Sequence, residues 1–314
     1  MKVLLHYDAG PELRKLLTEV ATAGLDIDCC PEADEALFRR RVAEADVLWH
    51  VLKPVTKEHI AAAPRLKLIQ KIGVGVNTID LDAARFHRVQ VANMPGTNTP
   101  AVAEMTLLLM LSALRYHPPL DRATRSGRGW VEGPARQERF GELGGRTVGL
   151  IGYGGVPRHL APALRALGCD VIYFARTPQA NAVGTRVPLA ELLAIADIVS
   201  LHVPLTDETR HMIDSAAIAR MKRGAVLINT ARGGLIDEPA LVAALKSGQL
   251  AAAGLDVFDS EPVDPNNPLL SLDNVVLMPH LAWLTRETWQ RSLAVAAENC
   301  RHIERGTAIL HRVA

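Results

Sequence analysis

The sequence has few aromatic residues, few cysteines and almost no net charge. Phe, Trp and Tyr make up 4% of the 314 residues, there are four cysteines, and the formal net charge is +1. A charge this small predicts no field that would recruit nucleic acid or an anionic membrane. Because the cysteines form no cluster with metal-ligand spacing, we expect free thiols in a reducing compartment, a cytoplasmic location and no bound metal.

Long hydrophobic runs are also missing. The most apolar long stretch, residues 101–114, contains Glu104 and is too short to cross a bilayer. The N-terminal residues MKVLLHYDAG contain only a very short apolar run, so we expect a first strand there and no signal peptide. A hydrophobic content of 48% with 22% charged residues is typical of a soluble globular protein, and the length suits two domains.

What the chain does have is a regular alternation of β-rich runs and helical patterns, which predicts parallel sheets covered by helices on both faces. The first set of predicted strands is Lys2–Tyr7, Asp26–Cys30, Val47–Trp49, Leu68–Lys71 and Val89–Ala92. A long helix near residues 101–114 and a polar segment over residues 121–140, interpreted as a surface loop with a short helix, interrupt the alternation. The second set is Thr147–Ile151, Val171–Phe174, Ile198–His202, Val226–Asn229, Ala253–Asp256 and Val275–Met278.

Six strands in the second set match a doubly wound dinucleotide-binding domain. The final helical segment, Thr285–Arg305, has no strand after it. We therefore expect it to pack on a layer that is already built.

The stretch LIGYGGVPRHLAPALRALGCDVIYFAR, residues 150–176, resembles a dinucleotide-binding fingerprint with two unusual positions. Gly152 allows a tight turn after the strand, Gly154 lets the backbone approach a pyrophosphate, and Gly155 adds backbone freedom. The start of the next helix then offers unpaired N–H groups to the anion. Pro157 stands where a third glycine is expected.

Pro157 is acceptable at the first helical position, where an N–H would have no partner. Pro162 is harder to accommodate, because a proline inside a helix removes a hydrogen bond and clashes with the preceding turn. Two outcomes are open: a helix kinked at residues 158–162, or a helix that begins one turn late. Arg158 either adds positive charge near the phosphates or is a solvated residue at the helix start.

Arg176 ends the next strand, 22 residues after Gly154. An acidic residue there would bind the two ribose hydroxyls, whereas an arginine can pair with a 2′-phosphate and favour NADP. Thr177 and Gln179 could add hydrogen bonds. The alternative is an ordinary surface arginine.

Three side chains with acid–base or anion-binding chemistry follow three successive predicted strands. Arg232 lies in INTARGGLIDE, Glu261 in LDVFDSEP and His280 in LMPHLAW. Open α/β sheets bind ligands at the carboxyl ends of their strands. An arginine can clamp a carboxylate, a histidine can act as acid or base near neutral pH, and a neighbouring glutamate can hold the imidazole and favour its protonated form.

Over essentially its whole length the chain resembles the D-isomer-specific 2-hydroxyacid dehydrogenases. The motifs that carry the resemblance are KIGVGVNTIDLDAA, VANMPGTNTPAVAEMTLLLML, the glycine turn, ADIVSLHVPLTDETRHMID, MKRGAVLINTARGGLIDEPALVAAL, GLDVFDSEP and MPHLAW. The resemblance implies an α/β fold of two doubly wound parallel-sheet domains. In it a Rossmann NAD(P)-binding domain, residues 98–285, is inserted into a flavodoxin-like substrate domain formed by residues 1–97 and 286–314.

The resemblance also implies roles for single residues. Arg232 would bind the substrate, Glu261 would hold the histidine, and His280 would donate the proton. The loop Gly73–Asn77, with Val74, Gly75 and Val76 at its centre, looks like the family's carboxylate cradle, unless it is an ordinary glycine turn. The cofactor contacts implied are Thr99, Gly152, Gly154, Gly155, Val156, Arg158, Arg176, Thr177, His202, Val203, Pro204, Thr209, Thr230, Ala231 and Asp256.

Some departures narrow the subfamily. Glu261 differs from the glutamine of formate dehydrogenases, and Val74 stands where phosphite dehydrogenase has a lysine. We expect no C-terminal regulatory domain of the kind found in longer phosphoglycerate dehydrogenases. Val51 and Leu52 occupy the loop that resembles the substrate-side wall and favour a small 2-oxo acid, although the nearby His50 and Lys53 could meet an anionic substrate end. Trp283 either covers the substrate or packs between domains.

The predicted function is an NAD(P)-dependent oxidoreductase that interconverts a small 2-oxo acid and its D-2-hydroxy acid. NADP(H) is the preferred cofactor, NAD(H) is possible, and the long helix resembles a homodimer contact. Two alternatives stay open: a nucleotide-binding scaffold or sensor with weak turnover, and the same chemistry on the substrate of a specialised pathway.

Overall fold

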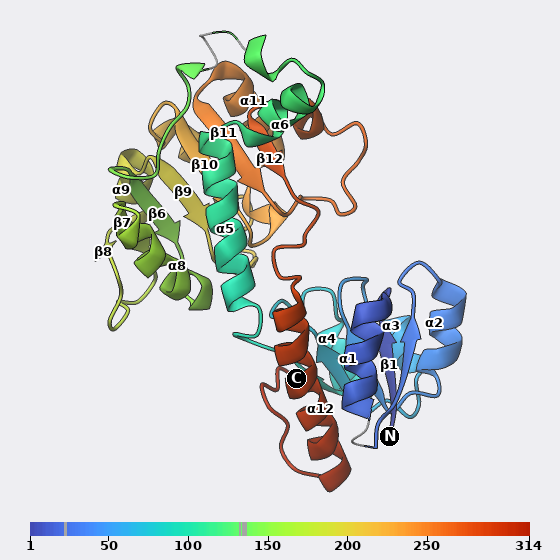
Figure 1. Cartoon of the computed structure of the whole chain (residues 1–314). Helices are drawn as coiled ribbons and strands as arrows, with labels where there is room; N and C mark the ends of the chain where they lie inside the picture. Colours follow the sequence, from blue (N-terminus) through green and yellow to red (C-terminus); the bar gives the residue numbers. More distant parts are fainter. Residues whose placement is uncertain (22–23, 132, 134–136) are drawn as a thin grey trace. The chain divides into compact units, whose positions relative to one another are not determined.

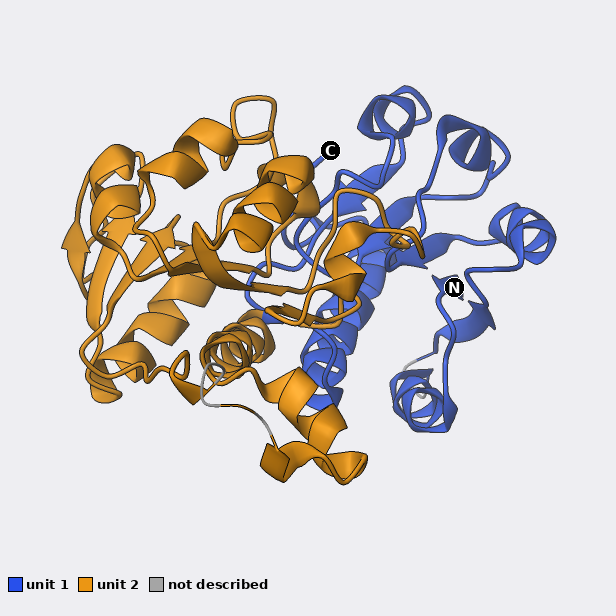
Figure 2. Cartoon of the chain, turned by 90° about the horizontal axis from the view of Figure 1, so that it is seen from above, with its two compact units in different colours: residues 1–98, 283–314 blue, residues 99–282 orange. Residues whose placement is uncertain are grey.

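The computed structural model describes residues 1–21, 24–131, 133 and 137–314 and separates into two compact units (Figure 2). Unit 1 contains residues 1–98 and 283–314, and unit 2 contains residues 99–282. Unit 2 is therefore one continuous segment inserted into unit 1. The predicted boundaries between the substrate domain and the nucleotide domain lie at residues 97/98 and 285/286. Because these boundaries separate functions rather than compact units, they stay a prediction.

Unit 1 is built on a five-stranded sheet in which the neighbouring strands are parallel. The strand order β2-β1-β3-β4-β5 is that of flavodoxin-like folds. All carboxyl ends therefore lie at one edge of the sheet. The strands are β1 (Lys2–His6), β2 (Asp26–Cys30), β3 (Val47–His50), β4 (Leu68–Lys71) and β5 (Gln90–Ala92). The helices are α1 (Pro11–Ala21), α2 (Glu35–Val42), α3 (Lys57–Ala61), α4 (Leu81–Phe86) and α12 (Arg286–Arg305).

Unit 2 is built on a seven-stranded parallel sheet with the order β12-β11-β10-β9-β6-β7-β8, a doubly wound Rossmann arrangement (Figure 1). The strands are β6 (Thr147–Ile151), β7 (Asp170–Phe174), β8 (Thr185–Arg186), β9 (Ile198–Leu201), β10 (Ala225–Asn229), β11 (Leu250–Leu255) and β12 (Val275–Leu277). The helices are α5 (Thr99–Leu114), α6 (His117–Arg125), α8 (Gly155–Ala166), α9 (Leu189–Ile195), α10 (Ser215–Arg220) and α11 (Glu238–Ser247), and single 3-10 turns cover Gly129–Val131, Gly233–Leu235 and Pro268–Ser271.

Each face of the seven-stranded sheet has its own hydrophobic core. On one face, Leu109 of α5 and Leu160 of α8 pack with Val148 and Ile228 of the strands. Helices α9, α10 and α11 supply the other core. Because both faces are covered, the strands are buried almost throughout, as parallel sheets require.

The final helix belongs to unit 1 and lies against α1 and β4, so it packs on a layer that is already built, as predicted. Thr285 caps α12 through its side-chain oxygen, and Gly306 ends the helix in the left-handed conformation. Buried Asn299 of α12 donates from Nδ2 to Oε1 of Gln70 on β4 at 2.6 Å. This polar contact fixes α12 on the sheet where apolar packing alone would let it slide.

Two predictions about secondary structure need correction. Six strands are predicted for unit 2, but a seventh, β8, adds Thr185 and Arg186 beside β7. It escapes sequence reasoning because two exposed polar residues carry no β pattern. The predicted loop at residues 121–140 begins inside α6, and its residues 132 and 134–136 lie outside the described part of the chain.

Candidate active site and cofactor turn

The predicted glycine turn connects β6 to α8. Gly152 has a φ of +97°, and a Cβ there would lie 2.5 Å from the carbonyl oxygen of His202, so only glycine fits. Gly154 precedes the helix, and there is open space within 4 Å of where its Cβ would stand. A cofactor pyrophosphate needs this kind of close backbone approach, so the turn fits a dinucleotide.

The start of α8 settles one question about the two prolines. The helix begins at Gly155, and its first backbone bond runs from Arg158 N–H to the Gly154 carbonyl at 3.1 Å. The predicted late start of the helix is therefore wrong, and exposed Pro162 lies inside a helix that is already formed. Pro157 is the third helical residue rather than the first, but it still lies in the turn where N–H groups have no partner within the helix.

Arg158 is directed toward the segment after β7. Its Nη2 donates to Gln179 Oε1 at 2.6 Å and its Nη1 to the Ala180 carbonyl at 3.2 Å. Its guanidinium carbon lies 5.6 Å from the centre of the Tyr153 ring, within cation–π range. Arg158 is thus held at the end of β7 that also carries Arg176.

Arg176 and Thr177 are exposed, just beyond β7. Arg186 of β8 braces this corner, because its Nε donates to the Ala175 carbonyl at 3.0 Å and its Nη2 to the Arg176 carbonyl at 3.2 Å. The segment of residues 175–180 therefore carries one arginine, Arg176, and is contacted by two others, Arg158 and Arg186.

The loop after β9 contains four of the predicted cofactor residues. His202 Nε2 lies 2.9 Å from Ser200 Oγ, and burial lowers the pKa of His202 to about 3. Thr209 Oγ1 donates to the Pro204 carbonyl at 2.7 Å and closes the loop. Val203 is the side chain nearest to the tight position of Gly152, and Thr99 at the start of α5 packs on Gly155. Two of the predicted cofactor residues, Thr99 and Val203, therefore lie against the glycine turn.

Glu261 and His280 form a direct pair near the ends of β11 and β12. The distance from His280 Nδ1 to Glu261 Oε2 is 2.5 Å, and Glu261 Oε1 accepts the Phe258 N–H at 2.9 Å. Burial alone would raise the pKa of Glu261, but the hydrogen bond and charge of His280, with Arg232 adding to them, lower it. Because Nδ1 faces the carboxylate, Nε2 is the ring nitrogen that can serve a substrate.

Arg232 follows β10 and is partly buried. Burial lowers its pKa, and the charge of Glu261 opposes this effect. A Cβ at the next residue, Gly233, would lie 1.9 Å from the Phe258 carbonyl, so the loops after β10 and β11 touch through this glycine. The structure thus brings together the three side chains predicted at successive strand ends.

Asp256 ties the histidine segment to the end of β11. Its two carboxylate oxygens accept the N–H groups of Leu281 at 2.8 Å and Ala282 at 3.0 Å, and its carbonyl accepts the His280 N–H at 2.7 Å. Burial raises the pKa of Asp256 in spite of these two donors. His280 has a φ of +57°, an uncommon conformation for a residue with a side chain, so its position depends on this scaffold.

The predicted carboxylate cradle, Gly73–Asn77, follows β4 in unit 1. Gly73 has a φ of +140°, its carbonyl accepts the Met94 N–H at 2.8 Å, and the Val74 carbonyl accepts from Asn93 Nδ2 at 2.9 Å. The Val74 side chain is 46% exposed. The loop therefore exposes the Val74 side chain to solvent, while its backbone carbonyls are held by the segment after β5.

The predicted wall, Val51 and Leu52, follows the neighbouring strand β3, and Lys53 comes next in the same loop. Lys71, at the end of β4, donates from Nζ to the Val51 carbonyl and so ties the wall to the cradle. His50 is fully buried, and its Nε2 lies 2.7 Å from Thr78 Oγ1. Burial, with Lys71 and His6 adding to it, lowers the pKa of His50 well below its usual value, so this ring does not meet an anionic substrate end.

Trp283 is packed within unit 1. Its ring centre lies 5.4 Å from that of Trp289 and 6.4 Å from that of Tyr7, both edge-on. The side chain is 8% exposed. It therefore forms part of an aromatic cluster at the start of α12.

Comparisons with known proteins agree with this geometry. A family model described as "D-isomer specific 2-hydroxyacid dehydrogenase, NAD binding domain" matches residues 107–282. A glyoxylate reductase of Korarchaeum cryptofilum is 39% identical over 284 residues, which cover 89% of this chain and 85% of that protein. The chain belongs to the D-isomer specific 2-hydroxyacid dehydrogenase family. It is an oxidoreductase with a nicotinamide-binding Rossmann domain, and the predicted family and fold class are confirmed.

Two further relatives show the range of this 2-hydroxyacid dehydrogenase family. A D-3-phosphoglycerate dehydrogenase of Archaeoglobus fulgidus is 37% identical over 321 residues, covering 100% of this chain and 59% of that protein. The crystal structure of a glyoxylate reductase from Paecilomyes thermophila superposes with a TM-score of 0.84 at 31% identity, covering 99% of this chain and 98% of the other. The substrates named for these relatives are all 2-oxo or 2-hydroxy acids.

Sequence reasoning missed several residues that support the dehydrogenase site. Asn229 at the end of β10 accepts the Ala231 N–H and donates to the Arg232 carbonyl, which shapes the arginine turn. Thr106 of α5 lies 2.9 Å, oxygen to oxygen, from Thr230. An asparagine directly after a buried apolar strand is a usable signal, whereas the Thr106 contact joins residues 124 positions apart and has none in the sequence.

In the described residues no helix has the length and apolar composition needed to span a membrane. The same residues contain no group of three or more His, Cys, Asp or Glu side chains arranged to hold a metal ion.

Proposed function

We propose that the protein reduces a small 2-oxo acid to the D-2-hydroxy acid and prefers NADPH over NADH. The observation that carries the proposal is the pair of His280 Nδ1 and Glu261 Oε2 at 2.5 Å, with Arg232 on the adjoining strand end. A protonated histidine that is held on one nitrogen can release its proton from the other. This is the acid that reduction of a carbonyl requires.

The nicotinamide cofactor, when bound, supplies the hydride. The protein's own contribution is to bind, orient and protonate. Arg232 is proposed to hold the substrate carboxylate and polarise its carbonyl, and His280 Nε2 to donate the proton to the carbonyl oxygen. The loop Gly73–Asn77 is proposed to receive the carboxylate through its backbone N–H groups.

The same turn and loops are proposed to hold the cofactor. Gly152, Gly154, Gly155 and Val156 would receive the pyrophosphate. The neighbouring residues would complete the site: Thr99, His202, Val203, Pro204, Thr209, Thr230, Ala231 and Asp256. This assignment is supported by the contact of Thr99 with Gly155 and of Val203 with the Gly152 turn.

The preference for NADPH depends on the arginines after β7. A 2′-phosphate carries extra negative charge and three acceptor oxygens, which exposed Arg176 and Thr177 can meet. Arg158, anchored at Gln179, adds a second cation at the same segment.

Two further proposals concern the state of the protein. We propose a homodimer formed through α5, supported by Leu108 and Leu111, which are 51% and 41% exposed on that helix. We also propose a cytoplasmic location, supported by four free cysteines, three of them buried.

The deciding experiment is a panel of 2-oxo acids assayed at neutral pH with NADPH and with NADH. We expect the highest kcat/KM for a short acid such as glyoxylate or hydroxypyruvate with NADPH. The variant Arg176→Asp should lower kcat/KM for NADPH by about 10- to 100-fold, the size of one lost charge-assisted contact, and lower NADH use far less. An unchanged cofactor ratio would remove Arg176 from the proposal, and no turnover of any 2-oxo acid would remove the function.

A further inference from the structure

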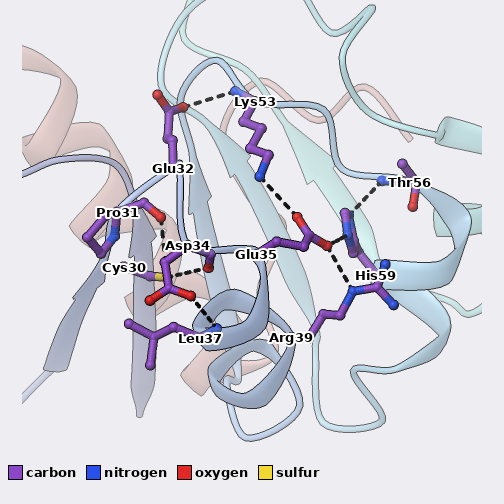
Figure 3. Close-up of polar contacts among 10 residues, drawn as sticks. All are labelled: Cys30, Pro31, Glu32, Asp34, Glu35, Leu37, Arg39, Lys53, Thr56 and His59. Carbon is purple, nitrogen blue, oxygen red and sulfur yellow. Dashed lines mark hydrogen bonds and ion pairs between the residues drawn. The ribbon is translucent and has the colours of Figure 1, made fainter.

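Lys53 comes directly after the wall, next to the proposed cradle, but its charge is compensated by a group of unit 1 that the proposed reaction does not use. Lys53 Nζ lies 3.0 Å from Glu35 Oε2 at the start of α2 (Figure 3). The same carboxylate receives His59 Nε2 at 2.7 Å and Arg39 Nε at 2.8 Å, both on Oε1. Three donors from three elements therefore fix the Glu35 carboxylate.

His59 contacts this cluster through one ring nitrogen. Its Nδ1 accepts the Thr56 N–H at 3.2 Å, so Nε2 is the ring nitrogen that faces Glu35 (Figure 3). The hydrogen bond from His59, followed by those from Lys53 and Arg39, lowers the pKa of Glu35 to about 2 in spite of partial burial. Glu35 is therefore ionised at any pH at which the enzyme would be assayed.

A second carboxylate lies against the wall itself. Glu32 Oε1 accepts the N–H groups of Leu52 at 3.0 Å and Lys53 at 2.9 Å. The charged groups at the wall are therefore two cations, Lys53 and Arg39, and two carboxylates, Glu35 and Glu32, which balance to no net charge. An ammonium 3.0 Å from a carboxylate acts on a more distant group as a dipole rather than as a positive charge.

The wall and the cradle lie side by side at one edge of the sheet. Strands β3 and β4 pair in parallel from Val47 and Leu68 to His50 and Lys71, and the Ile72 N–H donates to the His50 carbonyl at 2.8 Å. A substrate whose carboxylate occupies the cradle therefore has the wall beside its other end.

We propose that Glu35 is a specificity-determining residue that, by compensating Lys53, makes the enzyme select 2-oxo acids with an uncharged tail and reject those with a second anionic group. This inference rests on the proposed function, since it names the substrate class of the same site. The selectivity arises because a substrate with a second anionic group finds no uncompensated cation at the wall. It does not require an additional contact with the uncharged-tail substrate.

The test compares uncharged-tail substrates, glyoxylate and hydroxypyruvate, with oxaloacetate and 3-phosphohydroxypyruvate, which carry a second anionic group. The variant Glu35→Gln can still accept from His59 and Arg39 but no longer neutralises Lys53. We expect it to raise the ratio of kcat/KM for the anionic-tail class to kcat/KM for the uncharged class about tenfold, through a lower KM. Adding Lys53→Met should return the ratio to within twofold of wild type.

Glu44→Gln is the matched control. Glu44 Oε2 also lies 3.0 Å from a lysine ammonium, that of Lys2. Lys2 is the first residue of β1 and so lies at the amino ends of the parallel strands, away from the wall. The control removes the same charge and frees the same kind of cation, yet it should leave the ratio within twofold of wild type. A ratio that changes less than twofold in Glu35→Gln, or changes equally in Glu44→Gln, overturns the proposal.

If Glu35→Gln fails to fold, the single variant Lys53→Met still tests the proposal. It removes the ammonium, while Glu35 keeps Arg39 and Glu32 keeps the two backbone N–H groups at the wall, so the ratio should fall below that of wild type. An unchanged or higher ratio contradicts the inference. Calorimetric binding of D-malate against D-lactate measures the same discrimination without turnover. If no 2-oxo acid is reduced, the proposed function is wrong. The ratio of the D-malate affinity to the D-lactate affinity, compared between wild type and Glu35→Gln, still tests the role of Glu35.

Discussion

At the scale of single residues, the proposed chemistry depends on how His280 is held. Its ring is bound to Glu261, and its backbone is bound to Asp256 in a left-handed conformation. Both contacts come from the loop that follows the neighbouring strand β11. The ring nitrogen that is proposed to meet the substrate is therefore positioned by groups to which the proposal gives no reactive role.

Replacing the acid should reduce turnover much more than it reduces binding. We expect His280→Gln to lower kcat by about 10²- to 10⁴-fold, the usual contribution of a positioned acid, because glutamine cannot release a proton. Glu261→Gln keeps a hydrogen-bond acceptor that can hold the His280 ring, so its loss should be smaller. Steady-state kinetics measure both effects, and NADPH affinity by fluorescence titration is the control, expected to stay within threefold. Equal losses of kcat and cofactor affinity would indicate a structural defect instead.

Much of this site can be predicted from the sequence because each residue follows an apolar strand of a parallel sheet. Arg232, Glu261 and His280 are separated by about 20 to 30 positions, yet the sheet order brings their strands together, as the Glu261–His280 contact shows. The Glu35 cluster could not be predicted in this way. Its members come from α2, α3 and the loop after β3, and nothing in the local pattern at Lys53 reveals that a carboxylate already compensates it.

At the scale of elements, α8 is the unusual one, since it both begins the cofactor turn and contains an internal proline. Pro162 is exposed, so it buries no surface that would offset its cost. An ordinary residue there would donate a hydrogen bond to the Arg158 carbonyl. The sequence identifies this anomaly, but it leaves open where the helix begins, and the structure places the start at Gly155.

Pro162→Ala should therefore stabilise the protein. We expect an increase of about 1–3 kcal/mol in the free energy of unfolding, because alanine restores a hydrogen bond and is the best helix former. Urea denaturation followed by circular dichroism measures it. Pro157→Ala is the matched control and should give no gain, since position 157 lies in the first turn and its side chain is buried. A gain of equal size in both variants would point to the unfolded chain rather than to the helix.

At the scale of the whole molecule, both units contain histidines that resist protonation. Burial, with smaller effects of Lys53 and His59, lowers the pKa of His6 to about 4, against an opposing effect of Glu35; burial lowers that of His202 to about 3. Within the described part of the chain neither ring nitrogen of His6 has a hydrogen-bond partner, and its ring stacks on Phe38 at 3.8 Å. These side chains are neutral in the folded protein under mildly acidic conditions.

Stability should consequently decrease as the pH falls below about 6.5. Between that value and about 4, unfolded histidines take up protons that the folded His6 and His202 do not, so unfolding becomes easier by up to about 1.4 kcal/mol per pH unit for each group. Urea denaturation at several pH values between 7 and 4.5 measures the slope. His6→Leu should flatten it by one proton, whereas His159→Gln, at an exposed position of α8, should not. Identical slopes in wild type and His6→Leu would refute the prediction.

The insertion of unit 2 into unit 1 also has a consequence during synthesis. When residue 282 has left the ribosome, every residue of unit 2 has been made, but unit 1 still lacks residues 283–314. Until α12 emerges, Gln70 on β4 has no Asn299 to pair with. The sheet of unit 1 also lacks the helix that brings Trp289 and Leu293 to its core. The nascent chain therefore exposes all of unit 2 before it exposes all of unit 1, although unit 1 is begun first.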